Sequence, residues 1–462
     1  MTTEEIGDAL ALTAKLMELH EENAQKVKTL TNTAYRLHKT NPDFSGMSLE
    51  DIQKIDGMGK GVSAKIFELM QTGSTKELNL LLEKTPEGVI EMMSIKGIGP
   101  KKVRQLWKEL EIESIGELLY ACNENRLIDL KGFGTKTQDG VKANIEFKFA
   151  NANKAHYGRI IKDVEKLVSK LKTELETIYV SLTGEIYRKC EVIDKVEILI
   201  GSEKRPDENQ YVNEIKVPVQ FIYCNAKDFY YELVKTSSAE KHFTELNLIS
   251  SADKVCTTEK EVYTHADIQF TEPELREGLF EIEKAKNNSL PKLIEFTDLK
   301  GSLHNHSKYS DGVHSLEDMA LKCKELGYEY FGIADHSQSA FYADGLHPEK
   351  VLQQQIEIDK LNRKLAPFKI FKGIESDILN NGNLDYEEDI LKTFDYVVAS
   401  VHSNLKMDEE KATARLLKAI ENPYTTILGH PTGRLLLSRP GYPINYKKII
   451  DACAANGVIM EL

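Results

Sequence analysis

Residues 301–312 read GSLHNHSKYSDG and contain three residues whose side chains commonly bind metals. His304 and His306 flank a single residue, and Asp311 comes five positions later. Imidazole nitrogen and carboxylate oxygen together suit Zn²⁺, Mn²⁺ or Fe²⁺. A lone histidine is more often a hydrogen-bonded core residue, so the metal interpretation depends on whether later segments of the chain supply more ligands.

Five further apolar segments occur C-terminal to this stretch, most of them separated by helical sequence, as expected for buried parallel strands. The segments are YFGIADHS, IFKGIESDI, FDYVVASVHS, TTILGHPTG and GVIMEL. Strand ends of a parallel β/α barrel share one rim, so polar residues at these ends converge in space. Seven ligands exceed what one tetrahedral ion uses, and we predict two or three ions. The predicted metal ligands are His304, His306, Asp311, His336, Glu375, His402 and His430. We interpret Asp335 as a residue that orients a ligand.

A repeated pattern of two glycines occurs three times in the first 150 residues. The copies are IDGMGKGVSAKI from Ile55, IKGIGPKKVRQL from Ile95 and LKGFGTKTQDGV from Leu130. Glycine permits a sharp turn, and the amides of the turn and the following helix can bind an anion. One copy could equally be a helix connection, but three copies favour contact with DNA phosphates. The predicted contacts are Gly57, Gly59, Lys60, Gly97, Gly99, Lys101, Lys102, Gly132, Gly134 and Lys136.

Length and composition do not determine whether the protein binds nucleic acid. A chain of 462 residues is expected to form two to four domains. Its net charge of −13 argues mildly against nucleic-acid binding, although local basic clusters decide that question. The six cysteines lie far apart in the chain, and no apolar run is long enough to span a bilayer. We therefore expect a cytoplasmic protein with reduced thiols.

The motifs HNHSKYSDG, ADHS, GIESD, ASVHS and LGHPTGR resemble the successive motifs of the PHP (polymerase and histidinol phosphatase) family. The resemblance implies a distorted seven-stranded barrel that hydrolyses phosphoesters with Mn²⁺, Zn²⁺ or Fe, held by the seven ligands above. One difference is that the family has a late Asp-x-His pair, whereas this sequence stops at GVIMEL on the sixth strand. We expect a truncated chain or an open barrel with an incomplete site.

The order of regions resembles that of bacterial family X DNA polymerases with a C-terminal PHP domain. TNTAYRLHKT, the three glycine repeats, which resemble helix-hairpin-helix motifs, AEKHFTEL and TEPELREG carry the resemblance. It implies a helical DNA-binding domain over 1–88, a fingers-like domain over 89–150, a palm and thumb over 151–290, and a PHP domain over 299–462. The predicted fold is thus multidomain, α+β followed by an α/β barrel that is incomplete. Lys65 falls where lyase members of the family keep their Schiff-base lysine, although a solvated helix lysine is the simpler interpretation.

The palm departs from the family pattern. Active members carry an Asp-x-Asp pair and a third aspartate on a neighbouring strand, whereas here Lys195 and Glu197 occupy the pair and the third position aligns with Pro218. A lysine at a ligand position repels Mg²⁺. We therefore predict a degenerate polymerase site with little Mg²⁺ binding, and Asp194 lies on the opposite strand face if the register holds.

The leading hypothesis is a DNA-repair protein whose PHP barrel is a metal-dependent 3′→5′ exonuclease. We expect Arg434 and Lys308 to contact substrate phosphates and a monovalent cation to bind at the hairpins. We expect the protein to act as a monomer on gapped or 3′-ended DNA, without preference for DNA sequence. We expect no association with a membrane. The alternatives are a residually active gap-repair polymerase, a non-catalytic DNA-binding scaffold and a small-molecule phosphatase.

Overall fold

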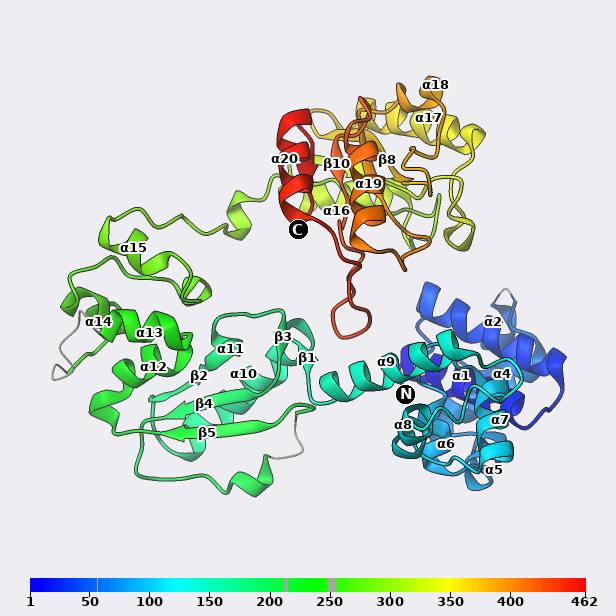
Figure 1. Cartoon of the computed structure of the whole chain (residues 1–462), viewed down its shortest axis with the longest axis horizontal. Coiled ribbons are helices and arrows are strands. Elements are labelled where there is room, and N and C mark those ends of the chain that lie inside the picture. The colour runs from blue at the N-terminus through cyan, green and yellow to red at the C-terminus, as the bar shows by residue number, and fades with distance from the viewer. Residues whose placement is uncertain (56, 212–214, 248–254) are drawn as a thin grey trace. The chain divides into compact units, whose positions relative to one another are not determined.

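The computed structural model describes residues 1–462 except 56, 212–214 and 248–254 (Figure 1). It divides into two compact units, Met1–Ala152 and Asn153–Leu462, and each is described by itself. None of the helices in the described ranges has the length and apolar character needed to cross a lipid bilayer.

The first unit is helical. Its helices are α1 (Thr3–Leu19), α2 (Ala24–Thr40), α3 (Leu49–Lys54), α4 (Lys60–Thr72), α5 (Lys76–Glu83), α6 (Glu87–Met92), α7 (Pro100–Leu110), α8 (Ile115–Asn123) and α9 (Thr135–Asn151). Buried apolar residues from Ile6 to Ile145 form one continuous core cluster. The two predicted helical domains, 1–88 and 89–150, therefore share a core, and residue 88 does not mark a break in the packing.

The three glycine repeats have the same local structure. They connect α3 to α4, α6 to α7 and α8 to α9. The first glycine of each repeat has a positive φ, between +73° and +94°, which side chains with a Cβ rarely adopt. The second glycine is the N-cap of the following helix, and the apolar residue between the two glycines is buried in the core. Each repeat is therefore a helical hairpin anchored by one apolar side chain.

The second unit begins with a small sheet and helices. The elements here are β1 (Ala155–His156), α10 (Tyr157–Glu174), β2 (Val180–Thr183), α11 (Gly184–Tyr187), β3 (Val192–Ile193), β4 (Val196–Ile200), η1 (Glu208–Gln210), β5 (Val219–Tyr223), η2 (Ala226–Asp228), α12 (Phe229–Ser237), α13 (Glu240–Asn247), α14 (Glu259–His265), η3 (Pro273–Leu275) and α15 (Glu281–Lys286). The three-stranded sheet has the order β2-β4-β5, with β4 antiparallel to β2 and parallel to β5.

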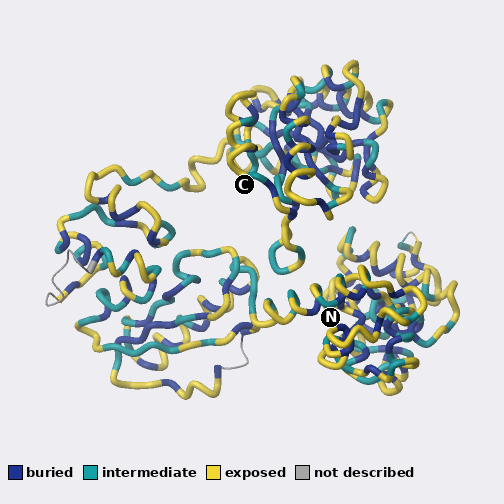
Figure 2. Tube along the Cα trace, viewed as in Figure 1, coloured by how far each residue is buried: buried dark blue, intermediate teal, exposed yellow. Residues whose placement is uncertain are grey.

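The unit ends in a six-stranded parallel sheet. Its elements are η4 (Phe296–Asp298), β6 (Gly301–Ser302), α16 (Leu316–Glu325), β7 (Tyr330–Ile333), η5 (Phe341–Ala343), α17 (Pro348–Leu365), β8 (Lys369–Asp377), α18 (Glu388–Leu391), β9 (Tyr396–Ser400), α19 (Glu409–Ile420), β10 (Ile427–Leu428), α20 (Tyr446–Asn456) and β11 (Ile459–Met460). The strand order β11-β10-β9-β8-β7-β6 follows the chain. Every predicted strand is present; β7, β8, β9 and β10 are largely buried, whereas β6 is half-buried and β11 is partly exposed (Figure 2).

The parallel sheet is curled but open, because β6 and β11 are edge strands among the described residues. The predicted fold class, with an incomplete β/α barrel, is confirmed. Sequential parallel strands with helical crossovers place all strand C-terminal ends on one rim, and the metal-binding candidates lie on that rim.

Candidate metal centre and nucleic-acid interface

The seven predicted ligands come together at the strand ends of the parallel sheet. Glu375 belongs to β8, and the histidines come after β6, β7, β9 and β10 in the chain. Their ligand atoms form three groups within which all atoms lie within 4.8 Å of one another. The groups are His304, Glu375 and His430; His306, Asp311 and His336; and His336, Glu375 and His402.

Glu375 lies at the centre of these groups with only 1% of its surface exposed. Its Oε1 atom is 3.2 Å from Nε2 of His304, 3.1 Å from Nε2 of His402 and 3.0 Å from Nε2 of His430. Burial alone would raise the pKa of Glu375, but the hydrogen bonds from the surrounding histidines hold it well below its usual value. Glu375 is therefore an ionised carboxylate surrounded by imidazole rings.

The residues fit divalent cations, because buried donor atoms face one another without hydrogen-bond partners. Among the described side chains, these atoms include Nδ1 of His306, Nδ1 of His336 and Oε2 of Glu375. Nδ1 of His336 lies only 2.9 Å from Oε2 of Glu375, yet the two atoms are not in hydrogen-bonding geometry. Buried polar atoms rarely stay unpaired. A mixed nitrogen and carboxylate set of this kind suits Zn²⁺, Mn²⁺ or Fe²⁺.

Two carboxylates outside the predicted set orient the histidines. Nδ1 of His402 lies 2.6 Å from Oδ1 of Asp377, and Nδ1 of His304 lies 2.8 Å from Oε1 of Glu461. Burial favours neutral imidazole, but these carboxylates and Glu375 raise the pKa of His304 and of His402 to about 9. Carboxylates behind metal-binding histidines commonly fix the ring orientation. Neither carboxylate was predicted from the sequence, although each lies at the end of a strand segment.

Asp335 lies outside all three ligand groups and organises the loop that carries His306 and Asp311. It accepts hydrogen bonds from the backbone N–H of Ser307 at 2.8 Å, from the Ser307 hydroxyl at 2.7 Å and from Nε2 of Gln354 at 2.6 Å. Ser310 donates a further bond at 2.5 Å. The carboxylate therefore holds the loop in position behind the ligands.

The two basic residues predicted to contact substrate phosphates do not join the cluster of predicted metal ligands. Lys308 and Arg434 are both exposed. Among the described residues, no ion pair or hydrogen bond connects either side chain to the seven ligands. Their role as phosphate contacts stays a prediction.

The palm positions form a charge pair. Nζ of Lys195 lies 2.7 Å from Oε1 of Glu197 and donates to Oε1 of Gln220 at 3.1 Å. The β4–β5 register pairs Glu197 with Gln220, so the side chain that meets this pair from β5 is that of Gln220. The assignment of the third carboxylate position to Pro218 stays a prediction; Pro218 comes directly before β5, and its carbonyl oxygen accepts the backbone N–H of Val196 at 2.8 Å.

Asp194 does not join the palm pair. Its Oδ1 lies 3.4 Å from Nζ of Lys154. Within the ranges that the structure describes, no group of three potential metal ligands occurs in the palm.

The hairpin turns offer open backbone to an external ligand. A Cβ placed on Gly59, Gly99 or Gly134 would meet no atom within 4 Å, and none of the three helices that they cap has a side-chain cap. The first backbone N–H groups of these helices therefore have no intrahelical partner, and α7 begins with Pro100, which has no N–H group. Of the four predicted lysines, Lys60, Lys101 and Lys136 are exposed, and Lys102 lies over the ring of Phe133 at 5.1 Å.

The hairpins also contact other parts of the unit. The side-chain amide of Asn144 in α9 donates to the carbonyl oxygen of Lys96 at 2.7 Å. This bond ties the third hairpin to the second. The guanidinium of Arg36 occupies the space beside Gly57 in the first hairpin.

Lys65 is engaged by a carboxylate. Its ammonium pairs with Glu77, and Lys26 pairs with the same side chain. Burial would raise the pKa of Glu77, but the two lysines lower it. The lysine that we compared with a Schiff-base lysine thus has the contacts of a structural ion pair.

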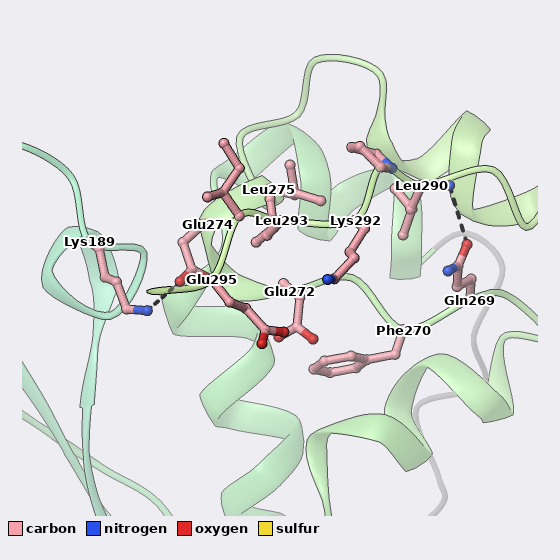
Figure 3. A pocket seen from close by; sticks show the side chains of 12 residues that line it. Lys189, Gln269, Phe270, Glu272, Glu274, Leu275, Leu290, Lys292, Leu293 and Glu295 are labelled. Carbon is pink, nitrogen blue, oxygen red and sulfur yellow. Dashed lines mark hydrogen bonds and ion pairs between the residues drawn. The ribbon is translucent and has the colours of Figure 1, made fainter. Parts of the chain in front are cut away.

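A separate hollow of about 550 Å³ is lined by Lys189, by side chains between residues 269 and 275, and by the segment 290–295 (Figure 3). Carboxylates and lysines line it together, and Lys189 pairs with Glu274 at 2.5 Å. Oε1 of Gln269 lies toward the chain at Leu290, whose N–H donates to it at 3.3 Å (Figure 3). None of the predicted site residues lines this hollow.

Comparison with known protein families identifies both the C-terminal parallel-sheet domain and the region of the second and third hairpins. The model of the PHP domain matches residues 302–461, and the model of the SAM-like helix-hairpin-helix tandem matches residues 89–142. The chain is 29% identical to the DNA polymerase/3′-5′ exonuclease PolX of Bacillus subtilis (strain 168), over 100% of this chain and 87% of that protein.

Proteins named probable phosphatases also match part of the chain. One from Acetivibrio thermocellus is 29% identical over 34% of this chain and 63% of its own length. One from Clostridium acetobutylicum is 36% identical over 35% of this chain and 62% of its own length. Of these three relatives, the DNA polymerase/3′-5′ exonuclease is similar to the full length of this chain, and the two probable phosphatases are similar to about a third of it. The chain therefore carries a helix-hairpin-helix tandem and a C-terminal PHP domain, and over its whole length it is similar to a DNA polymerase/3′-5′ exonuclease.

Proposed function

We propose that this protein is a metal-dependent DNA phosphoesterase that removes nucleotides from 3′ ends. The observation that carries the proposal is the arrangement of three ligand groups around Glu375, with buried donor atoms that lack hydrogen-bond partners. The full-length relative is named as a polymerase and 3′-5′ exonuclease, and the exonuclease half of that name agrees with this centre.

The seven ligands would hold two or three Mn²⁺ or Zn²⁺ ions. Such ions neutralise phosphoryl charge and supply an activated water near neutral pH. Glu375 would contribute to more than one group, because its two oxygens face different histidines. Asp377 and Glu461 would keep His402 and His304 in the orientation that presents Nε2 to Glu375.

The hairpins would bring DNA to the protein. Backbone N–H groups without an intrahelical partner and exposed lysines favour phosphate contact without base reading. These contacts support DNA over a small phosphomonoester as substrate. The proposal includes gapped or 3′-ended DNA as the form bound and the cytoplasm as the location. The ion pair of Lys195 with Glu197 favours loss of polymerase activity.

The decisive experiment compares a 5′-labelled single-stranded oligonucleotide with p-nitrophenyl phosphate, each with Mn²⁺ or Zn²⁺. We expect stepwise shortening of the oligonucleotide from its 3′ end, abolished by Glu375→Gln. His38→Ala serves as a control, because His38 belongs to α2 in the other unit. Turnover of p-nitrophenyl phosphate alone would instead favour the small-molecule phosphatase, which the names of the partial relatives also suggest.

A further inference from the structure

An exposed tyrosine, Tyr342, lies beside the predicted metal ligands, and its neighbour in the chain, Phe341, is exposed as well. Phe341 and Tyr342 belong to η5 in the loop after β7, and 84% and 63% of their respective surfaces are exposed. The Tyr342 ring centroid lies 5.9 Å from that of His336 and 6.4 Å from that of His402. Leaving large apolar rings in water forgoes the free energy of burying them, and exposed apolar surface at a site commonly marks where a ligand binds.

The loop that carries these rings is firmly anchored. Ala340 is fully buried, and its carbonyl oxygen accepts from the N–H groups of Ala343 at 2.9 Å and of Gly345 at 3.2 Å. On the other side, the Ser339 N–H donates to Oδ2 of Asp385 at 2.7 Å. The rings are thus presented on a fixed base, so that binding to them orders little additional backbone.

The Ser339 hydroxyl connects this loop to the metal centre. It donates to Oδ2 of Asp377 at 3.1 Å, while Oδ1 of Asp377 contacts His402. The position of the aromatic pair is therefore coupled through one carboxylate to a predicted ligand. Tyr342 thus borders the predicted site on the same rim, and Phe341 precedes it in η5.

We propose that Phe341 and Tyr342 form a stacking platform for an unpaired nucleobase of the strand whose phosphate lies at the metal-ligand residues. The inference rests on the proposed nuclease function and defines its substrate. A flat ring face matches any base, and such stacking is tolerant of sequence. A base inside a duplex has both faces covered, so the platform selects single-stranded or frayed ends.

A binding experiment tests stacking without turnover. The probe is an oligonucleotide with 2-aminopurine at its 3′ end and a methylphosphonate at the last linkage, titrated with Zn²⁺-loaded protein. Stacking on an aromatic ring quenches the fluorescence of 2-aminopurine. We expect quenching with the parent and with Tyr342→Phe, which keeps the ring, and loss of quenching with Phe341→Ala/Tyr342→Ala. Phe296→Ala is the matched control, because Phe296 is 93% exposed and precedes β6. Equal quenching by all four proteins would overturn the platform.

A kinetic experiment separates the platform from the nuclease. Each protein is given a normal oligonucleotide and one whose 3′-terminal residues are tetrahydrofuran analogues without bases. The double alanine variant should lose about 5- to 150-fold in kcat/KM on the normal strand, equivalent to about 1–3 kcal/mol, and little on the baseless strand. Equal losses on both strands would overturn base stacking and show that the loop only supports the metal centre. Cleavage of neither strand by the parent would overturn the nuclease function, while the fluorescence would still decide whether a base stacks.

Discussion

Nδ1 of His304 and Oε1 of Glu461 lie 2.8 Å apart, and the two residues come within two positions of the ends of the two edge strands of the parallel sheet. His304 comes after β6 and Glu461 comes after β11, so the contact connects the first strand end to the last. Oε2 of Glu461 also accepts the backbone N–H of His430 at 2.9 Å. The curl of the sheet thus brings its two edges together at the rim, where one carboxylate links two of the predicted ligands.

Removing this carboxylate is expected to weaken metal binding. Glu461→Ala frees the His304 ring to rotate, and loss of such an outer partner commonly costs 10- to 100-fold in metal affinity. Competition with a Zn²⁺ chelator measures the change, and Glu421→Ala, at the exposed end of α19, is the control. Unchanged affinity would show that Glu461 does not orient His304.

The number of bound ions is expected to depend on Glu375. Because its oxygens face several histidines, Glu375→Gln should remove more than one ion per chain, whereas His306→Ala should mainly affect the group that contains Asp311. Elemental analysis after loading with Mn²⁺ or Zn²⁺ and gel filtration gives the count. We expect at least two ions in the parent. A parent that retains none would contradict the metal centre.

Most of the rim could be predicted from the sequence because of the regular geometry of parallel strands. Each ligand accompanies a recognisable apolar strand, and β/α order places successive strand ends side by side. The hairpins could be predicted for a similar reason, since a positive φ at Gly57, Gly97 and Gly132 requires the residue type that marks the repeat.

The outer carboxylates could not be assigned in the same way. Glu461 contacts His304 across a separation of 157 residues, which no local spacing encodes. Asp377 lies two positions after Glu375 and so shares its side of β8, but its role depends on where the His402 ring points. The pairing of Gln220 with Glu197 was not predicted either, because strand register depends on pairing between strands, and a short shift in alignment changes which side chain faces its neighbour.

The hairpin turns are expected to bind DNA through their backbone. Gly99→Ala is conformationally tolerated, since the position is open and its φ is −93°, but the added methyl group obstructs a phosphate. Loss of one charge-assisted hydrogen bond, about 1.5–3 kcal/mol, predicts at least roughly tenfold weaker binding. Fluorescence anisotropy over a range of salt concentrations measures it.

The salt dependence distinguishes backbone from side-chain contacts. Gly99→Ala should leave the slope of affinity against salt unchanged, whereas Lys136→Ala should reduce its magnitude by about 1. Gly140→Ala is the control, because it adds a methyl group in open space within α9. Parent-like affinity in Gly99→Ala would mean that the second hairpin is only structural.

The region that carries α13, α14 and α15, which we call the thumb, is expected to lose stability at acid pH. Nδ1 of His242 lies 2.7 Å from Oε1 of Glu281, and its Nε2 lies 3.0 Å from the hydroxyl of Tyr263. Burial lowers the pKa of His242 below 6.5. Burial would raise the pKa of Glu281, but hydrogen bonds from backbone N–H groups and from His242 bring it below 4.5. Arg276 and Glu245 are the further charges that act on His242.

Folding lowers the pKa of both His242 and Glu281. The unfolded chain binds more protons than the folded chain as pH falls below 6.5, so the free energy of unfolding decreases. Hydrogen exchange of the α13 and α15 amides, corrected for intrinsic rates, should show faster opening at pH 5 than at pH 7. The pH effect should be smaller in His242→Gln and parent-like in His265→Gln. An identical pH effect in His242→Gln would show that this pair does not control the stability of the thumb.

The palm is expected to add nucleotides at no more than background rates. Lys195 lies 2.7 Å from the one carboxylate that remains, so a cation would have to displace an ammonium group from Glu197. At an effective dielectric constant of about 20, two unit charges about 4 Å apart interact by about 4 kcal/mol, and each 1.4 kcal/mol is roughly tenfold in rate or affinity.

Primer extension on gapped DNA with Mg²⁺ or Mn²⁺ tests this, in a His306→Ala background that prevents degradation of the product. Templated extension that persists after Glu197→Ala would place the catalytic carboxylates elsewhere, and extension that depends on Glu197 would show that one carboxylate suffices. The converse experiment is Lys195→Asp/Gln220→Asp. These positions and Glu197 meet across β4 and β5, so the variant assembles three carboxylates there. It should bind Mg²⁺ measurably more tightly than the parent by calorimetry, because the repelling ammonium has become a ligand. Unchanged Mg²⁺ binding would mean that Lys195 is not what keeps the cation out.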